Sequence, residues 1–473
     1  MNLTTKYLRY FIQVCAFLII YAFSFATPAV TPSAPAIPKS LVHNISAIVM
    51  NNQTQDIVYQ YDSSTPRLVA SNMKLITAAA ALQELHPDFH WHTKLYYTGS
   101  IDNGTLNGNL YIVGGGDPTF DERALREILG KLKDMQIHTI KGDLIIDNTI
   151  FNSLPTYSML KVENYDIDTT LPNGFMVDSD ISQFIIHINK KHKITINSNL
   201  YQYSIINKLS LNRSLKACPD LSKMVSFKNK NIVFAGKISP TCNNIKLEFN
   251  LLPHEDYVLM ALSQALNDLS LSFSGRLKYA KFTDKDNSAK LVYDYSSQSL
   301  EDALIYMNHY SVNLIAETSL LSLGAYTTSN NDTYKQAKQV YTDYMQKNNL
   351  LNNKFKAENG AGLSRTEYMS ADNMAHLLWL MAHSANSVNF ENTLPRAGEE
   401  GTLKHNFTNF GDKVRFKTGT LNDTRAYSGY FYAKDGTKYI VVVITNNVNA
   451  NDSNFNHMLD NWVSKLLYFT SQL

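Results

Sequence analysis

The chain has 473 residues, more than one ordinary hydrophobic core contains, so its length predicts two or three domains. Its 43 basic and 41 acidic residues give a formal net charge of +2 without a long block of like charge. That balance argues against a nucleic-acid partner held through its phosphates. A hydrophobic content of 44% with many Tyr and Phe residues excludes a disordered chain.

The N-terminus has the pattern of a secretory signal peptide, which we assign to residues 1–26. Lys6 and Arg9 supply a positive start, residues 11–25 are mostly apolar, and small residues precede the expected cut. An uncleaved membrane anchor is the alternative, but the apolar stretch is short for a full span of the bilayer. Residues 27–40 contain four prolines and predict an extended linker. The mature chain is therefore expected to be exported.

The first folded segment is expected to place Ser71 at the start of a helix. Residues 42–49 and 57–61 have strand character, and the Ala-rich stretch 71–85 favours a helix. Lys74 follows one turn later and shares the helix face that carries Ser71. Alone, this Ser-x-x-Lys string means little, because Ser is also a common helix N-cap.

A long strand-rich insertion separates this helix from the next motif. Ser71 and Ser311 are 240 positions apart, far more than one helical subdomain needs. We predict a discontinuous catalytic domain, residues 41–95 and 290–473, interrupted by a mostly β insert of one or two domains at 96–289. The glycines at 114–116 predict a tight turn and not a phosphate loop, because no Gly-Lys-Ser/Thr follows.

Two cysteines remain after the predicted signal, Cys218 and Cys242. In an exported protein an even pair is most simply a disulfide, and two separate buried thiols are the alternative. The 13 His residues are scattered, and no His or Cys cluster has zinc-ligand spacing. We therefore expect neither a metal site nor a cofactor.

The C-terminal part contains two further short motifs. Ser311-Val312-Asn313 opens a predicted helix that runs to residue 323, and Lys417-Thr418-Gly419 lies in a strand-like stretch. The remaining elements expected here are a helix at 372–385, strands at 427–432 and 439–444, and a final helix near 458–467.

In this order, the three strings supply the parts of one serine acyl-transfer site. A Ser hydroxyl is a poor nucleophile until a neighbouring base takes its proton, and Lys74 is placed to be that base. A helix N-terminus at Ser71 would favour the developing negative charge. The same trio occurs in penicillin-binding proteins and class A β-lactamases.

The chain resembles the class C, low-molecular-mass penicillin-binding proteins, which are serine-type D-Ala-D-Ala carboxypeptidases and endopeptidases. The likeness covers roughly residues 40 to 470. It includes the three motifs, the long insert and strings similar to those of the family at residues 68–75, 108–118, 359–365, 394–403 and 417–421. The resemblance implies an α/β (α+β) penicillin-binding, β-lactamase-like fold, an antiparallel sheet flanked by helices.

The resemblance also implies roles for individual residues. Ser71 would attack the substrate, Lys74 would accept its proton, and Ser311 would pass a proton to the leaving nitrogen. Asn313 would orient Lys74 and the substrate amide, while Lys417 would supply positive charge. The implied substrate-binding residues are Thr418, Gly419 and Thr420 of the third motif, with Arg365 as a second anchor and Asn422 beside the cleft; Arg365 could equally be a loop residue on the surface.

The implied partners are peptidoglycan stem peptides, with β-lactam antibiotics as covalent inhibitors, and the implied location is the periplasm. Loose association with the membrane, the oligomeric state and the balance of carboxypeptidase against endopeptidase are left open. Val312 replaces a residue that is often polar in the family, and no acidic residue is evident near Gly174 for a substrate amine, although Asp178 or Asp180 could substitute.

Two rival readings are retained. A class A β-lactamase shares the trio but lacks the long separation, and Glu358 is poorly placed to serve as its deacylating base. A catalytically silent wall-binding scaffold would keep the fold without the chemistry. The presence of every motif residue argues against the scaffold.

Overall fold

The computed structural model describes residues 33–155, 167, 170–228, 230–284, 288–328 and 332–473. The predicted signal peptide and the start of the proline-rich linker lie outside these residues. Within the described ranges, no helix is long and apolar enough to cross a membrane.

A five-stranded antiparallel sheet forms the centre of the predicted catalytic domain, which we call the catalytic body. Its strands, in spatial order, are β2 (Ile57–Tyr61), β1 (Ile45–Asn51), β22 (Lys438–Asn446), β21 (Thr424–Tyr432) and β20 (Val414–Leu421). Residues 439–444 of strand β22 form a continuous apolar run, because both faces of this strand are covered. Val441 and Val443 pack into the core on one face, and Val442 and Ile444 into the core on the other.

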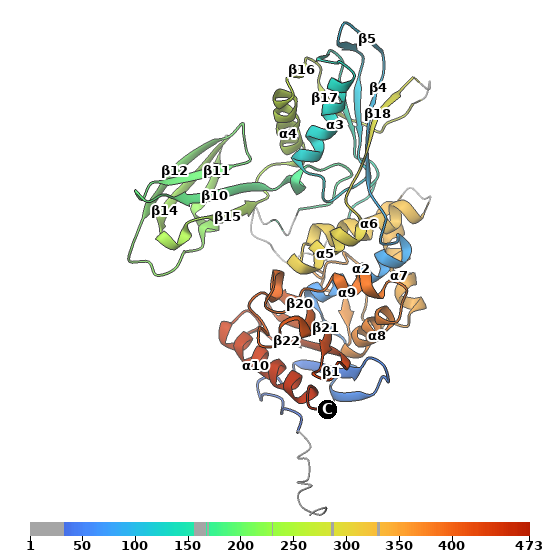
Figure 1. Cartoon of the computed structure of the whole chain (residues 1–473), viewed down its shortest axis with the longest axis vertical. Coiled ribbons are helices and arrows are strands. Elements are labelled where there is room, and N and C mark those ends of the chain that lie inside the picture. The colour runs from blue at the N-terminus through green and yellow to red at the C-terminus, as the bar shows by residue number, and fades with distance from the viewer. Residues whose placement is uncertain (1–32, 156–166, 168–169, 229, 285–287, 329–331) are drawn as a thin grey trace, which may run out of the picture.

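Helices cover the two faces of this sheet (Figure 1). Trp462 and Leu459 of α10 (Ser453–Thr470) pack on one face. The other core is built from the apolar α2 (Met73–Glu84) and from further helices. These are α5 (Leu300–Tyr310), α6 (Asn313–Thr327), α7 (Thr333–Lys347), α8 (Ala371–Ala382) and α9 (Ser387–Asn392). The sheet flanked by helices confirms the expected fold class.

Two paired strands carry the chain out of this body and back. Strand β4 (His92–Tyr97) leaves after α2, and β18 (Lys290–Ser296) returns beside it in antiparallel register. Both belong to a sheet with β7 (Leu110–Val113), β9 (Leu144–Asp147) and β17 (Leu277–Tyr279). A smaller sheet contains β5 (Ser100–Asp102), β6 (Thr105–Asn107), β8 (Thr139–Ile140) and β16 (Ser272–Phe273). Helices α3 (Glu122–Asp134) and α4 (His254–Asp268) pack with the strands of these two sheets in one hydrophobic core.

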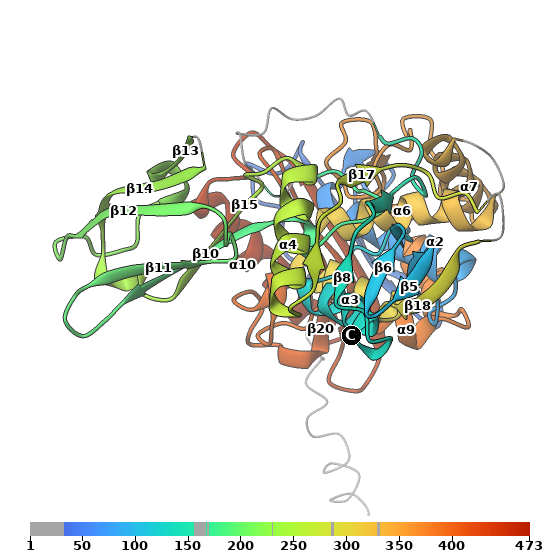
Figure 2. The same ribbon diagram turned by 90° about the horizontal axis from the view of Figure 1, so that it is seen from above.

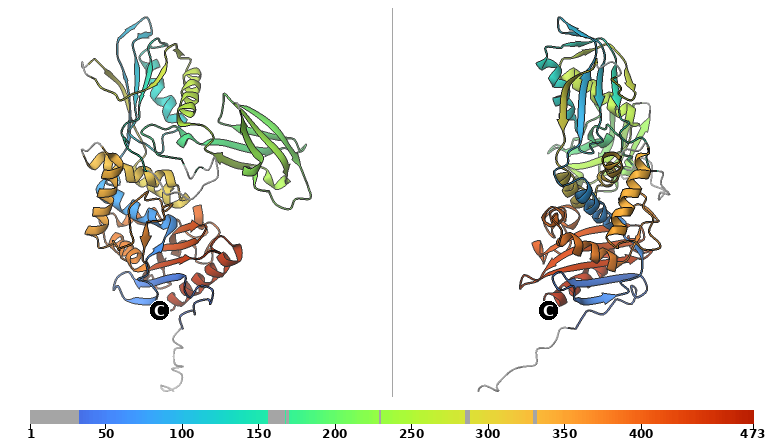
Figure 3. Two further views of the ribbon diagram at one scale, coloured as in Figure 1. Left: turned by 180° about the vertical axis from the view of Figure 1, so that it is seen from behind. Right: turned by 90° about the vertical axis from the view of Figure 1, so that its right-hand side faces the viewer.

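A second unit, which we call the basic lobe (residues 182–249), projects to one side of the molecule (Figures 1, 2 and 3). One of its sheets contains β10 (Ser182–Ile188), β11 (Ile194–Ser198) and β15 (Ile245–Phe249). The other contains β12 (Ser204–Leu211), β13 (Val225–Lys228) and β14 (Asn231–Ile238). Apolar residues of both sheets pack between them, and a disulfide joins Cys218 to Cys242.

The structure differs from the sequence-based expectation in several elements. The inserted region contains α3, which the strand-rich pattern did not predict, and α7 was also missed. Ser311 does not open a helix: it ends α5 in the left-handed region, and α6 begins at Asn313. Strand β2 has the predicted bounds.

Candidate active site

The three motifs meet where α2, α6 and β20 approach each other. Ser71 lies in a one-turn 3-10 helix, Ala70–Asn72, that leads directly into α2. Its neighbour Asn72 is buried and donates from Nδ2 to Ser428 Oγ of β21 at 2.6 Å. This contact helps to hold the turn with Ser71 against the sheet.

Lys74 is fully buried, and three oxygen atoms surround its Nζ. Nζ lies 3.0 Å from Ser71 Oγ, 2.6 Å from Asn313 Oδ1 and 2.7 Å from the Ala361 carbonyl oxygen. The last two oxygens can only accept hydrogen bonds, whereas a hydroxyl can also donate. A neutral amine would give its two N–H groups to Asn313 and Ala361. Its lone pair would then point at the hydroxyl proton of Ser71.

Lys417 is the second buried cation of the site. Its Nζ donates to Ser311 Oγ and to the Thr418 carbonyl oxygen, both at 2.9 Å. Burial, and then the charge of Lys74, holds the pKa of Lys417 well below its usual value of 10.5. The two lysines therefore place one side-chain nitrogen beside each serine hydroxyl.

Two glycines allow the backbone segments to approach this closely. A Cβ atom at Gly419 would lie 2.5 Å from the Val69 carbonyl oxygen, so no larger residue fits between β20 and the turn that holds Ser71. A Cβ atom at Gly362 would lie 1.9 Å from the Ala70 carbonyl oxygen, and this glycine has a φ of +89°. The last glycine of the Lys-Thr-Gly string and that of the Gly-Ala-Gly string are thus required sterically.

An unusual backbone conformation occurs at the residue before Ser71 and at Ser311 itself. Ala70 has a φ of 49° and Ser311 a φ of 61°, in the left-handed region that residues with a side chain rarely adopt. Such conformations persist only where surrounding contacts enforce them, and they cluster at active sites.

A buried carboxylate supports the loop that provides the Ala361 carbonyl. Glu367 Oε1 accepts the backbone N–H groups of Glu358, Asn359 and Gly360 at 2.9 to 3.0 Å. Burial raises its pKa from an ordinary 4.5 to about 7, against the lowering effect of these three donors. Sequence reasoning did not single out Glu367, because the partners that it holds are backbone atoms.

The third motif presents its threonines along β20, opposite β21. Thr420 pairs with Arg425 in the register of the two strands, and Arg425 Nη1 donates to Thr420 Oγ1 at 2.8 Å. Arg425 adds a partly exposed cation beside the threonines. The sequence analysis missed it, although a short turn at 422–423 between two strands would have paired these positions.

The two residues suggested as peripheral contacts have protein partners. Arg365 Nη1 binds both carboxylate oxygens of Asp423, at 2.9 and 3.0 Å. Asn422 is exposed and accepts from Asn451 Nδ2 at 2.7 Å. Arg365 therefore lies at the end of the β20–β21 hairpin with its charge balanced by Asp423.

Other residues considered from the sequence lie outside this cluster. The disulfide Cys218–Cys242 is in the basic lobe. Asp180 is buried and contacts His254 Nδ1 at 2.7 Å, so its carboxylate is engaged within the insert. Burial raises the pKa of Asp178 to about 6. Among the described residues, no group of three or more His, Cys, Asp or Glu side chains could hold a metal ion.

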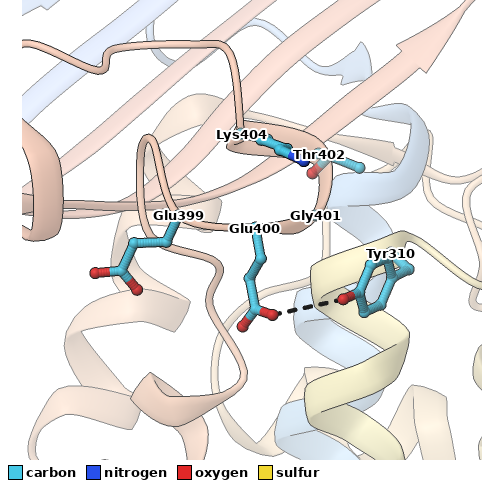
Figure 4. Close-up of a pocket in the computed structure, with 6 residues that line it drawn as sticks. All are labelled: Tyr310, Glu399, Glu400, Gly401, Thr402 and Lys404. Carbon is cyan, nitrogen blue, oxygen red and sulfur yellow. Dashed lines mark hydrogen bonds between the residues drawn. The ribbon is translucent and has the colours of Figure 1, made fainter.

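A surface cavity of about 420 Å³ lies beside the second motif (Figure 4). Tyr310, which precedes Ser311, contacts Glu400 Oε2 across it at 3.5 Å, and Thr402 and Lys404 also line it. The Gly-Thr-Leu string at 401–403 thus helps to form the wall of this cavity. None of the reactive atoms of the three motifs lines it.

The geometry brings two serine hydroxyls and two lysine amines together, with Lys74 Nζ at Ser71 Oγ and Lys417 Nζ at Ser311 Oγ. These are the groups needed to form and release an acyl-enzyme without a metal ligand or a histidine. A family model described as the D-Ala-D-Ala carboxypeptidase 3 (S13) family matches residues 33–466.

The chain is similar to the D-alanyl-D-alanine carboxypeptidase DacB of Haemophilus influenzae, with 24% identity over 452 residues and 92% of each chain covered. The crystal structure of penicillin binding protein 4 (dacB) from that organism superposes with a TM-score of 0.75 at 22% identity, covering 92% of this chain and 97% of that one. The penicillin G-acylated predatory endopeptidase Bd3459 of Bdellovibrio bacteriovorus gives a TM-score of 0.54 at 17% identity, covering 89% and 92%.

Proposed function

The chain belongs to the D-Ala-D-Ala carboxypeptidase 3 (S13) family, and on that basis we propose that Ser71 is the nucleophile of a serine DD-peptidase acting on peptidoglycan stem peptides. The observation that carries the proposal is the environment of Lys74 Nζ, which lies between Ser71 Oγ and two obligate acceptors. The activity is hydrolysis at a D-Ala residue, as carboxypeptidase, endopeptidase or both.

In the acylation step, Ser71 Oγ attacks the carbonyl carbon of the penultimate D-Ala. The hydroxyl proton passes to Lys74 Nζ, and the carbonyl oxygen becomes an oxyanion, held by the backbone N–H groups of Ser71 and Thr420. Asn313 keeps Lys74 in place and contacts the substrate amide.

The peptide bond breaks when the leaving nitrogen gains a proton from Ser311 Oγ, and Ser311 in turn takes up the proton that Lys74 accepted from Ser71, so that both groups return to their starting state. Lys417 Nζ, which donates to that oxygen, supports this transfer and stabilises the negative charge that develops. Water then attacks the acyl carbonyl, and the product acid leaves as Ser71 recovers its proton. A β-lactam would acylate Ser71 in the same way, but its leaving group remains tethered, so its acyl-enzyme would persist.

The terminal carboxylate of the substrate would bind the hydroxyls of Thr418 and Thr420, close to Lys417 and Arg425. Gly419 lets β20 approach the nucleophile closely enough for this contact. Arg365 is a second cation at the end of the same hairpin, where it would have to share its charge with Asp423. Asn422 would border the same cleft.

The test is release of D-Ala from a soluble peptide that ends in D-Ala-D-Ala. Wild type is expected to release it, and Ser71→Ala is expected to lose at least about 10³-fold in rate. Ser210→Ala, at an exposed serine of the basic lobe, serves as the matched control and should retain the wild-type rate. Equal rates for wild type and Ser71→Ala would refute the assignment.

We further propose that residues 1–26 direct export and are removed, so that the enzyme works in the periplasm. The relatives are cell-wall enzymes, which supports this location. N-terminal sequencing of the protein recovered from the periplasm should begin at Thr27. Recovery of the intact N-terminus in the membrane fraction would favour an anchor instead.

A further inference from the structure

Charge is distributed very unevenly along this nearly neutral chain. The basic lobe, residues 182–249, contains 11 Lys or Arg and 2 Asp or Glu, a formal charge of +9. Because the whole chain carries +2, all other residues together carry −7. The positive charge of the protein is thus concentrated in one projecting unit.

Every one of these 11 basic side chains is exposed to solvent. Lys208, Lys228 and Lys237 lie on the outer face of the β12–β14–β13 sheet, where the strand register places them on one surface. Lys246 lies on the outer face of the opposite sheet, beside a cavity of about 390 Å³. Three more lysines, at 190, 191 and 193, form the β10–β11 turn.

Few acidic groups balance these cations. The two acidic residues of the lobe pair with Lys223 and Lys246, at 3.2 and 2.6 Å. The lysines on the outer face of the β12–β14–β13 sheet take part in none of the ion pairs found among the described residues. A surface of this kind attracts polyanions through a field that acts beyond direct contact.

The shape of the lobe favours a hydrated polymer over a bilayer. Its positive groups occupy both outer faces and a turn, whereas a membrane would engage one plane. Its large exposed apolar residues, within the described part, are Tyr201 and Ile206, at 50% and 38% exposure. Two separate residues offer little apolar surface for insertion among lipid chains.

We propose that the basic lobe docks this enzyme on the carboxylate-bearing stem peptides of insoluble peptidoglycan, away from the bond that is cut. The inference rests on the proposed function, since it assumes that peptidoglycan is the substrate. Docking holds the active site at a high effective concentration of its substrate strands. Ammonium groups of the lobe pair with peptide carboxylates, and no covalent step is involved.

The test measures how much protein sediments with purified insoluble peptidoglycan at low salt. All proteins carry Ser71→Ala, so that the polymer is not digested during the assay. The triple variant Lys208→Glu, Lys228→Glu, Lys237→Glu is expected to bind about tenfold more weakly or worse. The matched control, Lys347→Glu, Lys434→Glu, Lys465→Glu, changes the net charge equally at exposed lysines of the catalytic body and should bind within about twofold of the parent.

The same two triple variants with Ser71 intact should release D-Ala from a soluble peptide at the wild-type rate, which also shows that they fold. Unchanged sedimentation of the lobe variant would overturn the proposal. So would binding of the parent to phosphatidylglycerol vesicles in preference to peptidoglycan. Loss of D-Ala release by the Ser71-intact parent, with sedimentation retained, would instead refute the proposed function and leave docking standing.

Discussion

The catalytic body and the basic lobe use the same side chain in opposite ways. In the body, Lys74 and Lys417 are fully buried, and each Nζ lies within hydrogen-bond distance of two or three oxygen atoms. In the lobe, lysines such as Lys208 and Lys237 are exposed on the outer face of a sheet.

Burial accounts for the different behaviour expected of these two groups of lysines. Removal from water makes the charged form costly, so a buried lysine becomes an acid or base whose neighbours decide its protonation. An exposed lysine keeps its charge and contributes a field that salt weakens. Changes at the buried lysines should therefore alter the chemistry, and changes at the exposed lysines should alter binding that depends on salt.

The largest effect is expected from removing Lys74, the proposed base. Lys74→Ala should lower the rate of acylation by about 10³-fold, since general-base catalysis of this type contributes on the order of 10² to 10⁴. Stopped-flow measurement of acylation by a chromogenic β-lactam would report it. Lys465→Ala, on the exposed surface of α10, is the control and should have no effect. A similar loss in Lys465→Ala would contradict the expected difference between buried and exposed lysines.

A smaller but specific effect is expected at Lys417. The acylation rate of wild type should fall with rising pH along a limb that lies well below pH 10.5, because burial and the charge of Lys74 lower the pKa of Lys417 and its deprotonation removes the positive charge beside Ser311. Lys417→Met cannot titrate, so this limb should disappear, and the rate below it should be lower than in wild type. A pH–rate profile of kcat/KM measures both. A falling limb that persists unchanged in Lys417→Met would show that it does not belong to Lys417.

Glu367 tests whether the support of the Lys74 site is itself sensitive to pH. Its pKa of about 7 in the folded protein exceeds its ordinary 4.5, so the folded state binds the proton more tightly. The resulting stabilisation is fully present below pH 4.5 and is lost as pH rises through 7, an effect on the order of 3 kcal/mol.

Glu367→Gln keeps an oxygen acceptor for the three backbone N–H groups but cannot titrate. Urea unfolding at pH 5 and pH 8 should show that wild type loses more stability than the variant over this interval. Equal losses would contradict the assignment of Glu367. Because Glu367 acts through the Ala361 loop, the variant should also keep a measurable acylation rate.

The smallest effect on turnover is expected in the basic lobe. Raising the salt concentration should leave the release of D-Ala from a short soluble peptide nearly unchanged, because Lys74 and Lys417 are buried and poorly screened. With insoluble peptidoglycan as substrate, the rate should fall with salt. An assay of both substrates over one salt series compares them directly, and parallel curves would mean that the lobe makes no separate contribution.

The three motifs and the strands of the central sheet could be predicted because short stretches of the sequence mark each of them. The continuous apolar run of β22, buried on both faces, and the Ala-rich α2 can be recognised in single stretches of sequence. Helix α3 could also have been recognised, since Asp121 caps it and Leu125, Ile128 and Leu132 have helical spacing. It was missed because this part of the insert was treated as β-rich.

What could not be predicted depends on contacts between distant backbone segments. The Ala361 carbonyl reaches Lys74 across 287 positions, and no side-chain pattern marks a carbonyl oxygen. The left-handed conformation of Ser311 conflicts with its local preference and is imposed by the surrounding structure. The position of Arg425 beside Thr420 depends on the register of β20 and β21, and only the two-residue turn between these strands indicates it in the sequence.

The most direct test of this account is the intact mass of the chain from residue 27 after incubation with benzylpenicillin, with Ser71→Ala treated in parallel. The account predicts a stable adduct on the wild-type chain equal to the mass of the whole drug, and no adduct on the variant. An adduct on both proteins, or no adduct on wild type with the drug left unhydrolysed, would contradict the assignment of Ser71 as the nucleophile.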